Sequence, residues 1–167
     1  AHLHFIPNGV DTERFRPRRD ADALPTGFPF RRGEHWVIGT IGRLAPVKNP
    51  LLLVDAFVRL VHSRAPETES MRVVMVGEGP LHDEIAQRIA DTGIADRVWL
   101  AGVRADIPEL LRAMDCFVLP SLSEATSCTL QEAMATALPV IATQVGGNAA
   151  LLEDGSHGIL VPSEDAP

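Results

Sequence analysis

The 167-residue sequence predicts one α/β domain, built as a parallel sheet with helices on both faces. Two observations carry this prediction. Short apolar runs alternate with amphipathic stretches along most of the chain, and the loops between them are short and rich in Gly. These runs do not alternate apolar and polar residues, which is typical of strands that are covered on both faces. The length is also sufficient to bury a sizeable core.

Composition and charge exclude several classes of protein. The chain is 46% hydrophobic and carries a net charge of −7, which argues against disorder and against a general nucleic-acid binder. No apolar run approaches the length of a membrane span. We expect Cys116 and Cys128 to be reduced thiols in a cytoplasmic protein. His2 and His4 alternate as strand neighbours would, but no third ligand lies near them, so no metal site is expected.

The first third of the chain contains two expected strands separated by an irregular stretch. Residues 4–6 predict a short strand that ends at the turn Pro7-Asn8-Gly9. Residues 10–33 are rich in Pro, Arg and Asp, and they predict a linker or a surface excursion. The run 36–41 is apolar and predicts a buried strand.

A helix is expected to follow this strand and its exit loop. Asn49 is positioned to cap the helix, Pro50 occupies its first position, and the pattern continues to about Arg64. The expected buried face consists of Leu52, Leu53, Ala56, Phe57 and Leu60.

The remainder of the chain repeats the alternation of strand and helix. Gly93 marks the end of one helix, Asp106 is a plausible cap of the next, and Pro139 stops the helix that follows Ser127. That helix should bury a stripe made of Leu130, Ala133, Met134 and Ala137. Further strands are expected at 72–76, 98–100, 116–119, 140–142 and 158–161, and further helices at 81–92, 107–114 and 148–152.

Polar, Gly-containing loops follow the expected strands. In open parallel sheets, ligands bind at the carboxyl ends of the strands, so these loops are the expected binding edge. They span residues 42–48, 77–79, 102–105, 121–127 and 144–147.

Two carboxylates flank the start of the helix that follows Ser127. Glu124 lies in the preceding loop and Glu132 lies about one turn inside the helix. The free N–H groups of a helix start hold phosphates, whereas carboxylates accept hydrogen bonds from sugar hydroxyls. This arrangement suits a nucleotide sugar. The alternative is that both residues are ordinary solvated carboxylates.

Two cations lie in the loop before another helix start. Arg43 and Lys48 follow Gly42, which allows a close approach of the backbone, and together they could neutralise a diphosphate; ordinary solvated charges are the alternative. A dinucleotide fingerprint would need Gly where His82 stands, so an NAD site is rejected. A P-loop sequence is also absent.

Several motifs in order resemble one known family. They read IPNGVDTERFRP, IGTIGRLAPVKNP, VVMVGEGP, VWLAGVRADIPELLRAMDCFVLPS and SEATSCTLQEAMATALPVIATQVGGNAALLEDGSHGILVP. The chain resembles the C-terminal, donor-binding domain of family-four retaining glycosyltransferases, which is one Rossmann-like half of a GT-B fold. The resemblance covers nearly the whole chain except about residues 18–34. The sequence at residues 8–17 and 42–53 is similar to that of transferases of bacterial exopolysaccharide clusters, notably the PEP-CTERM-associated type.

The resemblance implies a role for each matched position. Arg43 and Lys48 would grip the diphosphate and stabilise the leaving nucleotide, so that no metal and no other cofactor is implied. Glu124 would contact the transferred sugar and Glu132 the ribose hydroxyls. The remaining donor contacts would come from Gly42, Val103, Arg104, Ala125, Thr126, Ser127, Cys128 and Thr129, with Val103 and Arg104 at the base mostly through backbone groups.

One departure from the family pattern affects the sugar pocket. The family usually has Gly-Phe-Gly after the first Glu, whereas this chain has Ala125-Thr126-Ser127. The loss of two glycines restricts the backbone there and would change the shape of the pocket.

The resemblance also implies a larger parent protein. Residues 1–167 would be a single nucleotide-sugar-binding domain, with residues 1–33 leading in from a missing N-terminal domain and the final helices missing. The parent would transfer a hexose-type sugar to a polysaccharide or lipid-linked acceptor, which would bind through that missing domain, and would work in the cytoplasm, with peripheral association at the inner face of the membrane. The fragment alone is expected to be inactive. Two alternatives stay open: a GT-B-type nucleotide-sugar epimerase and a non-catalytic nucleotide or nucleotide-sugar sensor.

Overall fold

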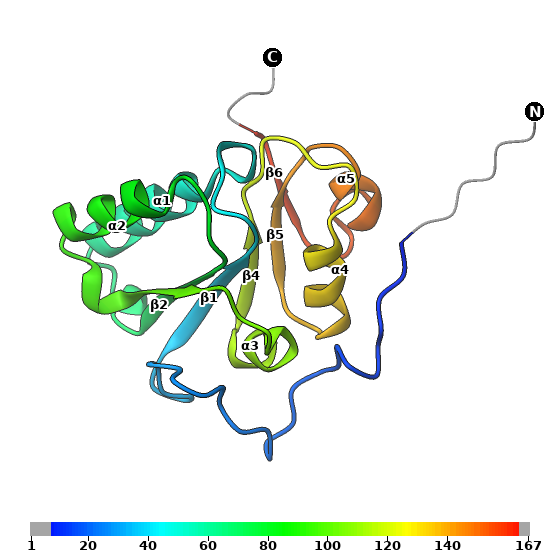
Figure 1. Cartoon of the computed structure of the whole chain (residues 1–167), viewed down its shortest axis with the longest axis horizontal. Coiled ribbons are helices and arrows are strands. Elements are labelled where there is room, and N and C mark those ends of the chain that lie inside the picture. Colours follow the sequence, from blue (N-terminus) through cyan, green and yellow to red (C-terminus); the bar gives the residue numbers. More distant parts are fainter. Residues whose placement is uncertain (1–7, 164–167) are drawn as a thin grey trace, which may run out of the picture.

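The computed structural model describes residues 8–163 and contains a six-stranded sheet in the order β3-β2-β1-β4-β5-β6 (Figure 1). All neighbouring strands are parallel. β1 pairs with β2 along its whole length, from Trp36 opposite Met71 to Ile41 opposite Val76. The predicted α/β architecture with a Rossmann-like parallel sheet is therefore confirmed. The strand expected at 4–6 lies outside the described residues.

Each expected element between residues 36 and 161 is present, with ends that differ from the prediction by a few residues at most. The strands are β1 (Trp36–Ile41), β2 (Met71–Val76), β3 (Val98–Gly102), β4 (Cys116–Leu119), β5 (Val140–Thr143) and β6 (Ile159–Val161). The helices are α1 (Pro50–His62), α2 (His82–Asp91), α3 (Ile107–Ala113), α4 (Cys128–Ala135) and α5 (Asn148–Leu151).

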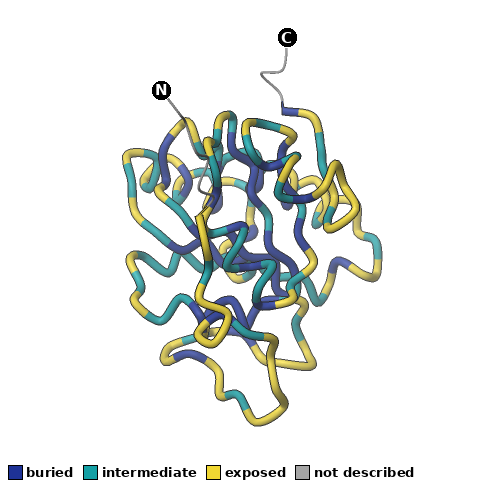
Figure 2. Tube along the Cα trace, turned by 90° about the vertical axis from the view of Figure 1, so that its right-hand side faces the viewer, coloured by how far each residue is buried: buried dark blue, intermediate teal, exposed yellow. Residues whose placement is uncertain are grey.

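Helices cover the two faces of the sheet in separate groups. Figure 1 shows α1 and α2 on one side and α3, α4 and α5 on the other. Along β2, Val73 and Met75 pack into the cluster under α1 and α2, whereas Val74 and Val76 pack into the cluster on the opposite face. The alternation follows from the two-residue period of a strand. The buried strands form the centre of the molecule, as Figure 2 shows.

The buried face of α1 differs from the prediction. Leu53, Val54 and Phe57 are buried, whereas Ala56 is exposed and Leu60 is 43% exposed. The prediction followed the spacing of apolar residues along the helix. Among the described residues no helix covers β4 to β6 on this side, and Leu60 lines an open apolar groove of about 380 Å³ there.

The apolar stripe of α4 is also shorter than predicted. Leu130 and Ala133 are fully buried, and Met134 is half-buried. Ala137 is exposed because α4 ends at Ala135 and Ala137 adopts a left-handed backbone conformation with φ 59°. The helix therefore stops before Pro139 is reached.

Neither predicted cap forms its side-chain hydrogen bond. Asn49 precedes α1, but it is left-handed with φ 47° and its amide side chain caps nothing. Asp106 precedes α3, but its carboxylate accepts two hydrogen bonds from Arg104 instead. A charged partner competes successfully with a cap because hydrogen bonds between charged groups are stronger than those to a backbone N–H.

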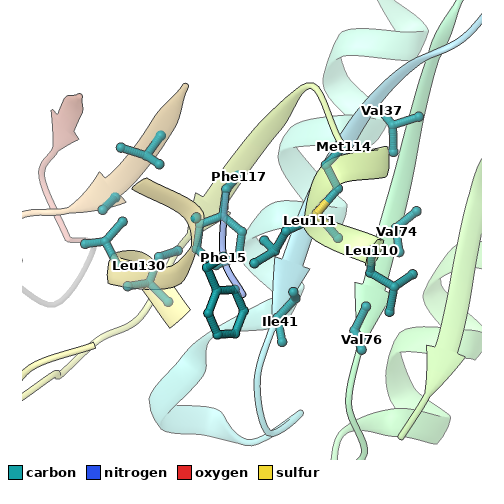
Figure 3. Close-up of a cluster of buried hydrophobic side chains, with 14 of the residues drawn as sticks. Phe15, Val37, Ile41, Val74, Val76, Leu110, Leu111, Met114, Phe117 and Leu130 are labelled. Atoms are coloured by element: carbon teal, nitrogen blue, oxygen red, sulfur yellow. The ribbon is translucent and has the colours of Figure 1, made fainter. Parts of the chain in front are cut away.

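The stretch before β1 packs against the domain, and the prediction of a surface excursion is wrong for its aromatic residues. Phe15 and Phe30 are buried in the cluster under α3 and α4, where Figure 3 shows Phe15 among the sheet residues. Phe28 meets the rings of Phe30 and Trp99 edge to face, with centroids 5.9 and 5.7 Å apart. No helix is present among residues 8–33, so this stretch is held by side-chain packing and by local turns, such as the one closed by the N–H of Phe15 and the carbonyl of Asp11 at 2.8 Å.

An ion-pair cluster fastens the same stretch. Asp22 accepts hydrogen bonds from Arg16 at 2.6 Å and from the backbone N–H of Arg19 at 2.8 Å. These donors hold the pKa of Asp22 well below its usual range. The guanidinium of Arg112, on α3, lies 3.6 Å from the same carboxylate and thereby ties the stretch to the helix layer.

Both cysteines are free, but their surroundings differ. Cys116 is buried in β4, and burial raises the pKa of its thiol to about 11. Cys128 is exposed at the first position of α4.

Candidate functional site

The loops that follow β1, β2 and β3 meet at one edge of the sheet. Parallel strands point their carboxyl ends the same way, so their exit loops become neighbours. The N–H of Leu44 donates to the carbonyl of Glu78 at 3.0 Å, and the N–H of Gly77 donates to the carbonyl of Gly102 at 2.8 Å. Gly77 has φ +129°, and a Cβ there would lie 2.0 Å from the carbonyl oxygen of Gly42. This close approach requires glycine.

The loops after β4 and β5 join the same edge. The N–H of Leu122 donates to the carbonyl of Val47 at 2.9 Å, which ties the loop after β4 to the loop after β1. The N–H of Gly147 donates to the carbonyl of Ala125 at 3.1 Å. A Cβ on Gly146 would lie 1.5 Å from the carbonyl oxygen of Glu124. The backbone that carries Glu124 is therefore held between two other loops.

Two of the predicted catalytic residues are in direct contact. The ammonium of Lys48 donates to Oε1 of Glu124 at 2.5 Å, although 76 residues separate them in the chain. The side chain of Glu124 is only 7% exposed, whereas that of Lys48 is 32% exposed. A carboxylate this buried requires a compensating charge, which Lys48 supplies.

The second predicted cation lies beside this pair without joining it. Arg43 is exposed and lines a small hollow together with Gly42 and Lys48. Its guanidinium has no ion pair with any of residues 8–163, so it is available for an anion. The three residues predicted around the diphosphate are thus brought together.

The start of α4 presents the expected free N–H groups. Ser127 is the N-cap, and its hydroxyl accepts a hydrogen bond from the N–H of Leu130 at 3.3 Å. The N–H groups of Cys128 and Thr129 donate to no other residue within 8–163. Glu124, Ser127 and these two N–H groups lie within six residues of chain, from the loop after β4 to the first turn of α4.

Glu132 lies on the next turn of α4. Its carboxylate has no hydrogen-bond partner among residues 8–163, and burial raises its pKa, an effect that Arg14 partly offsets. A half-buried carboxylate without a donor is an available acceptor for hydroxyl groups. The sequence prediction for Glu132 is compatible with this environment.

The loop after β3 places the two residues predicted at the base in different surroundings. Val103 is 78% exposed. The guanidinium of Arg104 donates twice to Asp106, at 2.8 and 2.6 Å, and lies 5.7 Å from the ring centre of Trp99. The Arg104 side chain is therefore committed within the protein, which leaves its backbone for a ligand.

The sequence analysis assigned no role to Ser121, which lies beside the Lys48–Glu124 pair. Ser121 is fully buried, and its hydroxyl donates to Oε1 of Glu124 at 2.6 Å. A polar residue two positions after the last residue of β4, just beyond Pro120, was the available signal, because such residues lie at the binding edge of a parallel sheet.

A search of residues 8–163 finds no group of three or more His, Cys, Asp or Glu side chains arranged to hold a metal ion. Within the same residues, no helix is both long enough and apolar enough to cross a membrane.

Comparison with known proteins places the chain in a family. The profile of the family described as "Glycosyl transferases group 1" matches residues 35–167. The chain is 35% identical, over 98% of its length, to UDP-Gal:alpha-D-GlcNAc-diphosphoundecaprenol alpha-1,3-galactosyltransferase of Escherichia coli. It is 34% identical, over 96% of its length, to the lipopolysaccharide core biosynthesis mannosyltransferase LpsB of Rhizobium meliloti. The chain spans 42% and 46% of these two relatives.

Solved structures show the same architecture. Anabaena Alr3699/HepE in complex with UDP matches 94% of this chain and 43% of its own length, with a TM-score of 0.75 and 27% identity. The C-terminal domain of the group 1 family protein LpcC from Francisella tularensis matches 93% of this chain and 81% of its own length, with a TM-score of 0.72 and 25% identity. The predicted half of a GT-B fold is therefore confirmed.

Proposed function

The chain belongs to the group 1 glycosyl transferases, and on this premise we propose that it is the donor-binding domain of a retaining glycosyltransferase. The parent transfers a hexose-type sugar from a nucleoside diphosphate to a polysaccharide or lipid-linked acceptor. The observation that carries this proposal is the convergence of Lys48, Arg43, the start of α4 and two carboxylates at one edge of the sheet.

The donor we propose is a nucleotide sugar bound across the loops after β1 and β4. Its diphosphate lies at the free N–H groups of Cys128 and Thr129, and Arg43 and Lys48 supply positive charge. Glu132 accepts hydrogen bonds from the ribose hydroxyls, and Glu124 accepts one from the transferred sugar. Alr3699/HepE has been solved in complex with UDP and with UDP-glucose, which supports a uridine nucleotide as the first donor to test.

The two cations assist departure of the nucleotide. As the bond between the sugar and the diphosphate breaks, negative charge develops on the leaving phosphate oxygen. Fixed cations at that position stabilise the transition state more than the ground state. In this proposal they do the work that a divalent metal does in other transferases, and no metal or cofactor is required.

The acceptor would bind outside the described domain. The Escherichia coli relative is named for a lipid-linked diphosphoundecaprenol acceptor, and the chain spans less than half of that relative. We propose that residues 1–33 lead in from an acceptor-binding domain and that the parent works in the cytoplasm, peripherally at the inner face of the membrane. The domain alone would bind the donor without transferring sugar.

The test is calorimetric titration of the chain with UDP, GDP and ADP, and then with sugar conjugates of the nucleotide that binds. Lys48→Ala and Glu132→Ala should each weaken binding by about 10- to 100-fold, because each removes a hydrogen bond to a charged group. Arg59→Ala and Glu67→Ala remove exposed charges away from these loops and should leave the affinity unchanged. Full affinity in both Lys48→Ala and Glu132→Ala would refute the assignment.

A further inference from the structure

The surroundings of Glu124 contain a fixed hydroxyl as well as a cation. The Ser121 hydroxyl and the Lys48 ammonium both donate to the same oxygen, Oε1 of Glu124, at 2.6 and 2.5 Å. The other oxygen, Oε2, accepts no hydrogen bond from residues 8–163. Since a carboxylate has two oxygens that each accept hydrogen bonds, Oε2 remains available to a ligand.

The backbone of Ser121 is fixed by hydrogen bonds to neighbouring elements. The carbonyl of Ser121 accepts a hydrogen bond from the buried hydroxyl of Thr143, at the carboxyl end of β5, at 2.5 Å. The carbonyl of Thr143 in turn accepts one from the side-chain amide of Asn148 at 3.0 Å, and Asn148 is also fully buried. The adjoining N–H, that of Leu122, is bonded to the loop after β1. The position of Ser121 is therefore fixed, next to Glu124 in the loop after β4.

The two donors to Glu124 are not equivalent when a ligand is bound. Lys48 is partly exposed and is the cation that a diphosphate would attract, whereas Ser121 is inaccessible to any ligand. When the Lys48 ammonium also interacts with a diphosphate, it holds Glu124 less strongly. The Ser121 hydroxyl is then the donor that keeps Glu124 in place. A carboxylate held in one orientation loses less conformational entropy when it binds a hydroxyl.

We propose that Ser121 is a positioning residue for recognition of the transferred sugar, anchored through Thr143. It keeps Oε1 of Glu124 turned into the protein and so presents Oε2 to a sugar hydroxyl. This inference rests on the proposed donor-binding function and assigns Ser121 to one half of the donor. Ser121 serves the sugar half of the donor, and the diphosphate half is bound without it.

The experiment compares UDP with UDP-glucose by calorimetry in the whole chain and in matched variants. The ratio of the two affinities isolates the contribution of the sugar. Ser121→Ala should reduce that ratio by about 5- to 20-fold and leave the affinity for UDP within about twofold. The expected loss is smaller than for a direct contact because Ser121 acts on the sugar through Glu124, so only part of the free energy of one hydrogen bond to a charged group is lost. Ser123→Ala removes an exposed hydroxyl from the same loop and should change neither value.

A second pair of variants tests the anchor. Thr143→Val removes the hydroxyl bonded to Ser121 while it keeps the volume, and it should lower the ratio in the same direction. Thr143→Ser keeps the hydroxyl and should preserve the ratio. A purely structural effect would weaken UDP and UDP-glucose by equal factors.

Three outcomes are decisive. An unchanged ratio in both Ser121→Ala and Thr143→Val, with normal UDP binding, would overturn this inference and leave the proposed function standing. Equal losses for UDP and UDP-glucose in Ser121→Ala would overturn it too, because the residue would then serve folding. If the unsubstituted chain binds no nucleotide sugar at all, the proposed function fails, and the inference fails with it.

Discussion

Gly146 provides a quantitative test of how the loop that carries Glu124 is held. Gly146 has φ +50°, and a Cβ there would lie 1.5 Å from the carbonyl oxygen of Glu124. Gly146→Ala therefore incurs two costs. A left-handed conformation costs a non-glycine residue about 1–2 kcal/mol, and a steric overlap in packed structure costs about 1–3 kcal/mol more. We expect the free energy of unfolding to fall by about 2–5 kcal/mol, from a total that is typically about 5–15 kcal/mol.

A matched glycine separates the two costs. Gly93, after α2, has φ +70° and no atom within 4 Å of its Cβ position. Gly93→Ala should therefore show only the conformational cost of about 1–2 kcal/mol. Urea denaturation of both variants measures the difference. Titration of Gly146→Ala with UDP-glucose should also show weaker binding, because the clash moves the loop that carries Glu124. Equal destabilisation by the two substitutions would refute the proposed backbone contact.

Three further predictions address packing and titration. Phe57→Ala should destabilise the domain by about 3–5 kcal/mol, whereas Leu60→Ala, on the exposed groove, should change stability by at most about 0.5 kcal/mol. Equal losses of stability in urea denaturation would contradict the buried face of α1 that the structure shows. Burial raises the pKa of Glu132, so its ionised form destabilises the fold, and Glu132→Gln should be more stable than the unsubstituted chain at pH 7. The gap in stability should shrink as the pH falls through the raised pKa and should be closed by about pH 4.5, the ordinary value. A pH-independent gap would exclude titration of Glu132 as the cause. Arg16 lowers the pKa of Asp22, so ionised Asp22 stabilises the fold. Asp22→Asn should therefore be less stable than the unsubstituted chain at pH 7, and this difference in stability should narrow only below about pH 3.8. Equal stability at pH 7 would show that the ion-pair cluster does not stabilise the packing of residues 8–33.

The order of elements could be predicted because local patterns decide it. Apolar runs such as Trp36–Ile41 and Cys116–Leu119 are short and continuous, and loops with Gly or Pro bound them. The alternation with helices then leaves a parallel sheet as the simple solution. The binding edge follows from that topology, which is why Glu124 and Lys48 were found as neighbours of the same site.

The errors arose where tertiary contacts override local preference. The Asp106 carboxylate was a reasonable cap by position, but Arg104 two residues earlier is a stronger partner. Leu60 has the spacing of a buried residue, but the described residues place no helix over that part of the sheet. Phe15 lies in a Pro- and Arg-rich stretch without periodicity, so nothing local indicated that it joins the core.

The details of the site depend on contacts between distant residues. Lys48 and Glu124 are 76 positions apart, and the ion pair between them exists because two loops meet at the sheet edge. The role of Gly146 depends on a backbone oxygen of another loop. One sequence does not encode such distances in any local pattern.

We propose that a nucleoside diphosphate binds at the start of α4, between Lys48 and Glu132. The most direct test is titration of the isotope-labelled, 18.0-kDa chain with UDP, followed by backbone amide shifts in NMR spectra. We expect saturable shifts that are largest at the amides of Cys128, Thr129 and Gly42. The largest shifts at the opposite edge of the sheet, around Arg18 and Trp36, would contradict it.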